Sequence, residues 1–254
     1  MPRYALMVEY DGAPFHGWQR QAAGLPSVQQ AIEEAAAHLN AGIVPVVGAA
    51  GRTDAGVHAE AQVAELDLDA DYAPERVREA LNFHTRPHPI SILRAARVPE
   101  GWSARFSCIG RAYRYRILNR RPRPALDAGR VWHVQARLDA GAMHEAAQML
   151  LGKHDFSAYR ASSCQAKDAL RTLDRLDVAR FAEDVEFRVE ARSFLHHQVR
   201  NLVGTLVMVG QGKRPLTWPR SVLDSHDRAR AGQTAPPEGL TFLAARYAEA
   251  LDWV

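Results

Sequence analysis

A short glycine-rich segment holds the most distinctive group of reactive side chains. Residues 48–59 read GAAGRTDAGVHA, with the carboxylate Asp54 and the guanidinium of Arg52 among three glycines. Glycine permits positive φ and close backbone approach to a ligand, and functional side chains concentrate in loops between regular elements. Asp54 is therefore a candidate nucleophilic or electrostatic carboxylate. The same pattern fits a tight turn in which Asp54 only caps the backbone. The segment lacks the Gly-Lys-Ser/Thr ending of a P-loop.

Arginine is the dominant cation, and its distribution is uneven. Between Arg94 and Arg137 lie eleven arginines and two acids, a balance of +9 over 44 residues. The planar guanidinium suits phosphate and stacks on bases. The same stretch holds aromatic residues, and a basic stripe with aromatics is typical of a nucleic-acid surface: Trp102, Phe106, Tyr113, Tyr115 and Trp132. The alternative is that these arginines lie on a solvent-exposed surface that binds no nucleic acid.

Composition narrows the class of protein. The chain has 254 residues, 47% hydrophobic and 24% charged, with a net charge of +3, which is ordinary for a globular protein. No apolar run reaches the ~18 residues of a membrane span, and the start of the chain is too acidic for a secretory signal, so we expect a cytoplasmic protein. Cys108 and Cys164 cannot form a disulfide framework. No set of histidines, cysteines and acids has structural-zinc spacing, so we expect no metal.

The hydrophobic pattern predicts the elements that position these side chains. Apolar alternation and turn signals predict strands at 3–11, 44–50, 62–69, 90–98, 111–119, 170–180, 185–192 and 241–247. Helical periodicity predicts helices at 27–40, 74–82, 138–151 and 196–209. We therefore predict an α+β fold of two related α/β halves, residues 1–107 and 108–254. The expected architecture has a mostly antiparallel central sheet, helices packed outside it, and an active-site cleft between the halves.

The predicted strand at 111–119 alternates aromatic and basic residues. Tyr113, Tyr115 and Ile117 share one face, and Arg114 and Arg116 share the other. We expect the two arginines to contact nucleic-acid phosphates and the tyrosine face to point the other way.

Several motifs together resemble the tRNA pseudouridine synthase A family. GRTDAGVHA at 51–59 matches the segment that carries that family's catalytic aspartate. Other matches follow in chain order over about residues 3–247, and they include EYDG at 9–12, FHGWQRQ at 15–21, RAYRY at 111–115, LGKHDFS at 151–157, FLHHQVRNLVG at 194–204 and APPEGL at 235–240.

This resemblance implies a pseudouridine synthase-like fold and a specific activity. The expected reaction is the isomerisation of uridine to pseudouridine at positions 38, 39 and 40 in the anticodon stem-loop of tRNA, by a homodimer without cofactor or metal. By the same resemblance, Asp54 is the catalytic aspartate and Arg52 helps displace the target nucleotide. Tyr113 is the active-site tyrosine, and Arg200 is the basic residue paired with Asp54.

The chemistry leaves alternatives open at each residue. Asp54 could attack C1′, attack C6 of uracil, or promote a glycal route. Tyr113 could relay the C5 proton or only stack on the base, because a phenol stays protonated near neutral pH and is a poor base unless assisted. Arg52 could fill the space of the extruded base, whose extrusion costs a few kcal/mol, or only contact phosphate. Arg200 could instead be a surface arginine beside an apolar helix face.

Two other function classes compete with this hypothesis. The first is a non-catalytic tRNA-binding or folding factor on the same scaffold, which an intact Asp54 disfavours. The second is a carboxylate-dependent hydrolase, which would need a second acid that the Asp54 loop lacks. The sequence departs from the family's pattern at 82–90, where it reads NFHTRPHPI, so the resemblance implies no contacts for this loop.

Overall fold

The computed structural model describes residues 1–21 and 24–254. It contains two compact units. The first unit comprises residues 1–109 and 241–254, and the second comprises residues 110–240. The last strand therefore belongs to the first unit although it stands at the far end of the sequence.

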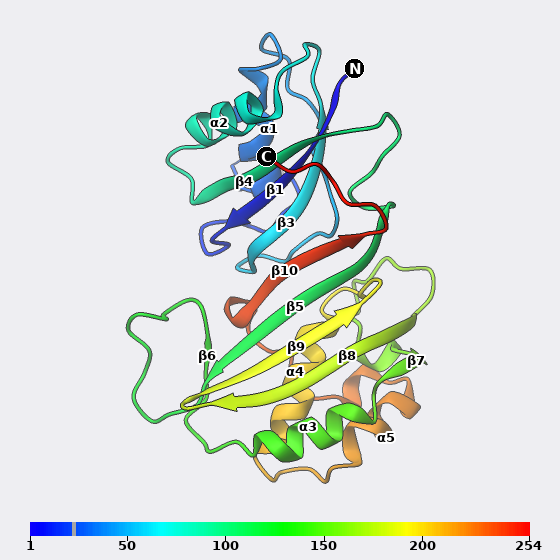
Figure 1. The fold of residues 1–254 in the computed structure, drawn as a ribbon. Coiled ribbons are helices and arrows are strands. Elements are labelled where there is room, and N and C mark those ends of the chain that lie inside the picture. The colour runs from blue at the N-terminus through cyan, green and yellow to red at the C-terminus, as the bar shows by residue number, and fades with distance from the viewer. Residues whose placement is uncertain (22–23) are drawn as a thin grey trace. The chain divides into compact units, whose positions relative to one another are not determined.

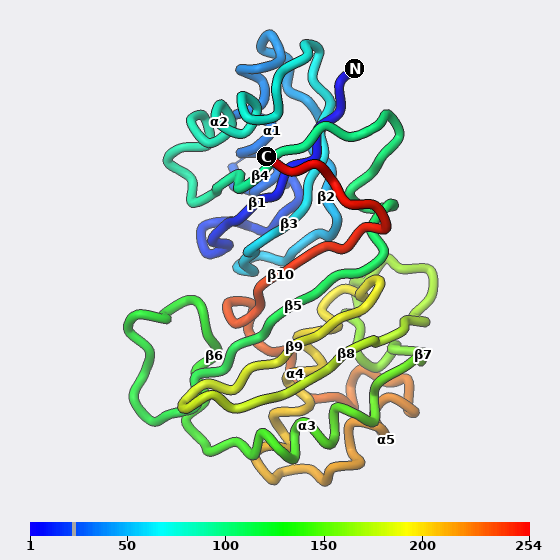
Figure 2. Tube along the Cα trace, in the orientation of Figure 1, coloured from blue at the N-terminus to red at the C-terminus, as the bar shows by residue number. Residues whose placement is uncertain are grey.

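The first unit is built on an antiparallel sheet with one parallel addition. β1 (Arg3–Tyr10) lies between β3 (His58–Asp67) and β4 (Ile90–Val98) and is antiparallel to both. The short β2 (Gly48–Ala49) pairs with β3, as Figure 2 shows, and β10 (Leu240–Tyr247) is parallel to β3. β1 reads almost entirely apolar because it is the central strand of this set, and Tyr4, Leu6 and Val8 are fully buried.

The first unit also contains two helices. α1 (Val28–Ala37) begins where the Ser27 side chain accepts a hydrogen bond from the Gln30 N–H and so caps the helix. α2 (Pro74–His84) begins with proline, which is tolerated in the first turn because no helical partner is lost there. α2 packs on β4 and α1 packs on α2.

In the second unit the main strands follow the order β5, β9, β8, β7. β5 (Cys108–Leu118) pairs with β9 (Asp184–Ala191), β9 with β8 (Leu170–Phe181), and β8 with β7 (Gly152–Asp155), all antiparallel. The two-residue β6 (Trp132–His133) runs parallel to the end of β5.

Three helices pack together against this second sheet (Figure 1): α3 (Ala140–Gln148), α4 (Gln198–Gly210) and α5 (Trp218–Ser225). Single 3-10 turns occur at Ser157–Tyr159, Arg228–Arg230 and Pro237–Gly239. α4 is apolar on nearly all sides because it is buried along most of its length. None of the described helices has the length and apolar character needed to cross a bilayer.

The predicted α+β class with a mostly antiparallel sheet is confirmed, and one predicted strand is wrong. Of residues 44–50, only Gly48 and Ala49 form a strand. The Val47 N–H donates to the Glu33 side chain at 3.1 Å instead of to a neighbouring strand, and Val44 and Val46 are exposed. Most of this apolar run therefore serves as a linker, in which the Val47 N–H is bonded to a helix side chain.

Candidate active site

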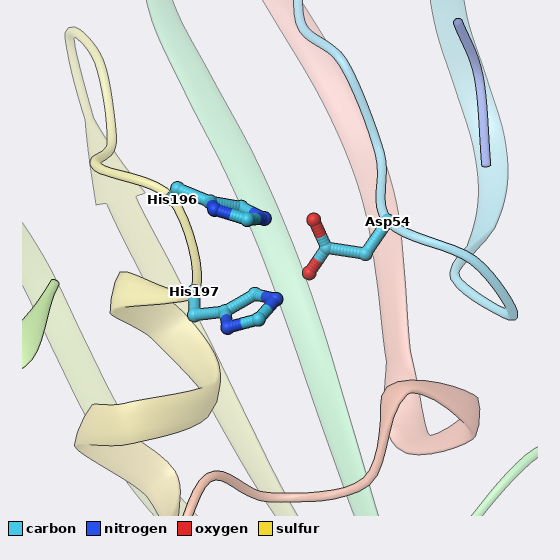
Figure 3. A group of neighbouring side chains, drawn as sticks. All are labelled: Asp54, His196 and His197. Atoms are coloured by element: carbon cyan, nitrogen blue, oxygen red, sulfur yellow. The ribbon is translucent and has the colours of Figure 1, made fainter. Parts of the chain in front are cut away.

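Asp54 stands at the start of a tight turn in the first unit. The Val57 N–H donates to the Asp54 carbonyl at 3.1 Å, which closes the turn across Ala55 and Gly56. Gly56 has φ of 77°, a conformation that strongly favours glycine at the third position of such a turn. The Asp54 side chain is half-buried, whereas neighbouring Arg52 is exposed. Figure 3 shows the Asp54 carboxylate extending from this loop.

Buried polar contacts hold the residues just before Asp54. The Thr53 hydroxyl lies 2.8 Å from the Tyr10 hydroxyl, and the Thr53 carbonyl accepts from the Trp18 N–H at 3.0 Å. Gln62 of β3 donates to the Gly51 carbonyl at 2.7 Å. Burial raises the pKa of Tyr10 to about 12, so its hydroxyl stays protonated across the physiological range. The turn therefore has rigid support from β1, β3 and residues 15–18.

Two glycines allow this close packing. Gly17 has φ of 91°, and a Cβ there would lie 2.6 Å from the Thr53 carbonyl oxygen. A Cβ on Gly12 would lie 2.0 Å from the Val57 carbonyl oxygen. The Gly12 N–H donates to His58 Nδ1 at 3.1 Å. His58 thus braces the loop through the Gly12 backbone.

The loop at 82–90, where the sequence departs from the family, supports the same region. The Asn82 amide bonds both backbone groups of Ile92, at 2.9 and 2.8 Å, and so ties α2 to β4. His88 packs near Phe15 with ring centroids 5.8 Å apart, and the Pro89 carbonyl accepts from the Asp11 N–H at 3.1 Å. Although its residues differ from the family's pattern, this loop therefore contacts residues 11–15, which lie next to the segment that braces Asp54.

Arg200 belongs to the first turns of α4 in the second unit. The helix follows His197, a non-glycine residue with φ of 61°, and Figure 3 shows His196 and His197 on the segment leading into it. Arg200 Nε donates to the Ala235 carbonyl at 2.7 Å, and the Ala235 N–H donates to the Arg200 carbonyl at 3.1 Å. One edge of this guanidinium is therefore fixed by the backbone.

The segment that holds Arg200 can approach α4 only because of Gly204. A Cβ on Gly204 would lie 1.8 Å from the Gln233 carbonyl oxygen. Residues 233–235 thus cross the helix in direct backbone contact, one turn beyond Arg200. This glycine stands in the FLHHQVRNLVG motif, but its packing role depends on a partner more than 25 residues away and is not visible from the motif.

Tyr113 lies on the buried face of β5, as predicted. Its side chain is 7% exposed, and its ring meets Phe194 edge-on with centroids 5.2 Å apart. Next on this face, Tyr115 donates its hydroxyl to the Pro236 carbonyl at 2.7 Å, and burial raises its pKa. The predicted alternation of tyrosines and arginines along β5 is confirmed by the burial pattern.

Arg114 and Arg116 lie on the other face of β5 and face carboxylates of their own unit. Arg116 bonds Asp184 at 3.0 Å and Asp127 at 3.3 Å. Arg114 Nε lies 4.0 Å from a Glu186 oxygen. Such pairs compete with phosphate for the guanidinium, so a role in RNA binding stays a prediction for both arginines.

Comparison with known proteins gives the class of protein. The sequence model of the family described as tRNA pseudouridine synthase matches residues 6–107 and 146–248, one match in each half of the chain. Pseudouridine synthases are isomerases. The chain belongs to the tRNA pseudouridine synthase family.

Curated relatives match over nearly the whole chain. The chain is 60% identical over 248 residues to tRNA pseudouridine synthase A of Acidiphilium cryptum, covering 97% of each protein. It is 57% identical to the enzyme of the same name from Methylobacterium nodulans, covering 98% of each. A third relative, from Rhodospirillum centenum, is 57% identical over 97% of this chain and 100% of its own.

Proposed function

We propose that this isomerase converts uridine to pseudouridine at positions 38, 39 and 40 in the anticodon stem-loop of tRNA, with Asp54 as its catalytic carboxylate. The observation that carries the proposal is the placement of Asp54. In a chain of this family, its carboxylate extends from a turn that buried hydrogen bonds hold from both sides. Such preorganisation is what a nucleophile or charge-stabilising group needs.

The reaction requires one well-placed carboxylate and no outside donor. The N1–C1′ glycosidic bond breaks, the base turns, C5 bonds to C1′, the C5 proton leaves, and N1 takes up a proton. Atoms and electrons are conserved overall. Asp54 is chemically competent either as a nucleophile or as a negative charge near the sugar, and Asn in its place would supply neither.

The remaining site residues have supporting roles in this proposal. Arg200 pairs with Asp54 and orients it, since a guanidinium offers two parallel donors to one carboxylate. Tyr113 stacks on the base or relays the C5 proton. Arg52, which is exposed, occupies the space of the extruded nucleotide or contacts its phosphate.

Substrate docking involves the wider basic surface and a second subunit. Arg114, Arg116 and the other arginines between residues 94 and 137 contact phosphates without reading sequence. We further propose that the enzyme is a homodimer, in which one subunit performs catalysis while the other helps dock the stem-loop. The substrate places this activity in the cytoplasm.

Replacing Asp54 with asparagine tests the catalytic proposal. We expect Asp54→Asn to lose pseudouridine formation by at least about 10⁴-fold, because removing a group that reacts covalently abolishes its step, while the affinity for tRNA changes less than threefold. Pseudouridine mapping of tRNA gives the first quantity and a binding titration gives the second.

The matched control is Asp69→Asn, the same chemical change at an exposed position of the same unit. It should retain full turnover. Appreciable turnover by Asp54→Asn would reject an essential role for the Asp54 charge.

A further inference from the structure

A hollow in the second unit is bordered by cations and by no acid. It has a volume of about 650 Å³ and lies at the C-terminal end of α4. Its charged lining residues are Lys213, Arg214 and Arg230, here called the α4-end patch. An adjoining hollow of about 770 Å³ shares Arg214 and adds Arg137 and Arg180. Its one acid, Asp139, accepts a hydrogen bond from the Ala142 N–H.

The patch differs from several other cations of the protein because its charges are not neutralised locally. Arg116, Arg175 and Arg220 each bond at least one carboxylate. Among the residues that the structure describes, no ion pair or side-chain hydrogen bond involves Lys213, Arg214 or Arg230. Three uncompensated cations around a concave surface create a positive potential that attracts a polyanion.

One of the three cations is already held in place. The Arg214 guanidinium lies over the Trp218 ring, 5.1 Å from its centroid. A guanidinium that rests on an aromatic face keeps its planar donors in a defined direction. Arg214 would therefore lose less conformational freedom on binding an anion than an unrestrained arginine would.

The surroundings favour a nucleic-acid backbone over a protein or a membrane. None of the described large apolar side chains in residues 204–233 is among those strongly exposed. A protein interface needs an apolar core of contacts, and a membrane surface needs apolar side chains that enter the lipid. Cations without exposed apolar neighbours suit phosphates instead.

We propose that the α4-end patch binds the phosphate backbone of tRNA at nucleotides outside the target uridine. This inference rests on the proposed function, since it adds a contact for the same substrate. α4 connects the two places: Arg200 lies near its start, and Gly210 lies ten residues later, about 15 Å along the axis at 1.5 Å per residue. α4 would thus position Arg200 near its start and contact the RNA backbone near its C-terminal end.

The test is a triple variant that removes the patch charges, Lys213→Gln, Arg214→Gln and Arg230→Gln. Its dissociation constant for full-length tRNA is measured by fluorescence anisotropy at several salt concentrations. The logarithm of the binding constant falls linearly with the logarithm of the salt concentration. Losing about three phosphate contacts should flatten this salt slope by about two units. The affinity ratio of wild type to variant then changes by about 16-fold between about 50 and 200 mM salt. Turnover at saturating tRNA should stay unchanged.

The matched control removes one lysine and two arginines elsewhere, by Lys153→Gln, Arg76→Gln and Arg78→Gln. It changes the net charge equally and should leave the slope within half a unit of wild type. The single variants Lys213→Gln and Arg230→Gln should each flatten the slope by about 0.7–0.9 units. They keep the test decisive if the triple variant folds poorly.

A patch variant with the control's salt slope would overturn the inference. The same holds if the triple variant changes only the sedimentation of the protein, because the patch would then contact a second copy of this chain. Pseudouridine mapping of the wild-type product separates the two proposals. An inactive wild type rejects the proposed function, whereas an active wild type with an unaltered patch variant rejects this inference alone.

Discussion

Arg200 and Asp54 are both positioned by their backbone surroundings. The Asp54 carbonyl closes its own turn by accepting from the Val57 N–H, so the peptide that carries the carboxylate has little freedom. Arg200 uses Nε to bond the Ala235 carbonyl at 2.7 Å. An ammonium group cannot reproduce this geometry, because lysine has no donor at the position of Nε. At the residue scale, the shape of the Arg200 side chain matters as well as its charge.

Arg200→Lys should therefore reduce kcat by about 10- to 100-fold, because a misplaced positioning group costs about that much even when its charge is kept. The affinity for tRNA should change less than threefold. Single-turnover pseudouridine formation at saturating enzyme gives the rate constant. Arg220→Lys, an arginine on α5 that pairs with Asp224, is the control and should behave as wild type. A fully active Arg200→Lys would show that charge alone suffices.

At the scale of elements, the crossing of α4 by residues 233–235 supports the site. A side chain on Gly204 would collide with the Gln233 carbonyl. We predict that Gly204→Ala lowers the free energy of unfolding by about 1–3 kcal/mol, the usual cost of overpacking. The better helix propensity of alanine offsets only about 0.5–1 kcal/mol. Urea denaturation measures the change.

Gly204→Ala should also reduce activity, because moving Ala235 moves the anchor of Arg200. The control is Gly141→Ala in α3, where a new Cβ would meet only the Asp139 side chain, at 3.3 Å. That variant should be close to neutral in stability and fully active. Equal stability of the two alanine variants would contradict the packing argument.

The pairing of β1 with β3 includes a pH-dependent contact. Arg3 lies opposite Asp67 in the register and bonds it through two atoms, at 2.8 and 2.7 Å. The hydrogen bond from Arg3 holds the pKa of Asp67 below its ordinary value. The folded state therefore favours the ionised carboxylate. This stabilisation is complete above the unfolded pKa of about 4 and is lost as pH falls through the lower folded value.

Both side chains are partly exposed, so the pair contributes only about 0.5–1 kcal/mol. We predict that Asp67→Asn lowers the free energy of unfolding by this amount at pH 7, and that its difference from wild type shrinks as pH falls below about 4, the ordinary pKa of an aspartate. Denaturation curves across this range measure it. Asp69→Asn, an exposed neighbour, should show no such pH-dependent difference. A constant deficit for Asp67→Asn at every pH would point to packing instead of charge.

At the scale of the whole molecule, the proposed homodimer makes a prediction about mass. Sedimentation at micromolar concentration should give about twice the chain mass of 28.2 kDa, because a stem-loop that contacts one subunit for catalysis needs a second for docking. Activity should fall on dilution below the dissociation constant of the dimer. A fully active species of single-chain mass would refute this arrangement.

Features that depend on neighbouring residues were predictable from the sequence. The Asp54 loop and the two faces of β5 follow from glycine conformation and the two-residue period of a strand. The motifs along the chain also identified the family, because their order and spacing are specific. The helix α5 and the short strands β6 and β7 were not predicted, since their patterns are short and irregular.

The tertiary structure decided which distant groups meet. Most of the 44–50 run is not a strand, and Glu33 accepts the hydrogen bond from the Val47 N–H. The Arg116 side chain faces Asp127 and Asp184. Gly204 is required by Gln233, and β10 joins the first unit from the far end of the chain. Each of these outcomes depends on which groups, distant in the sequence, are brought into contact in the folded chain. Sequence periodicity sets which face a residue occupies, but only the folded chain sets its partner.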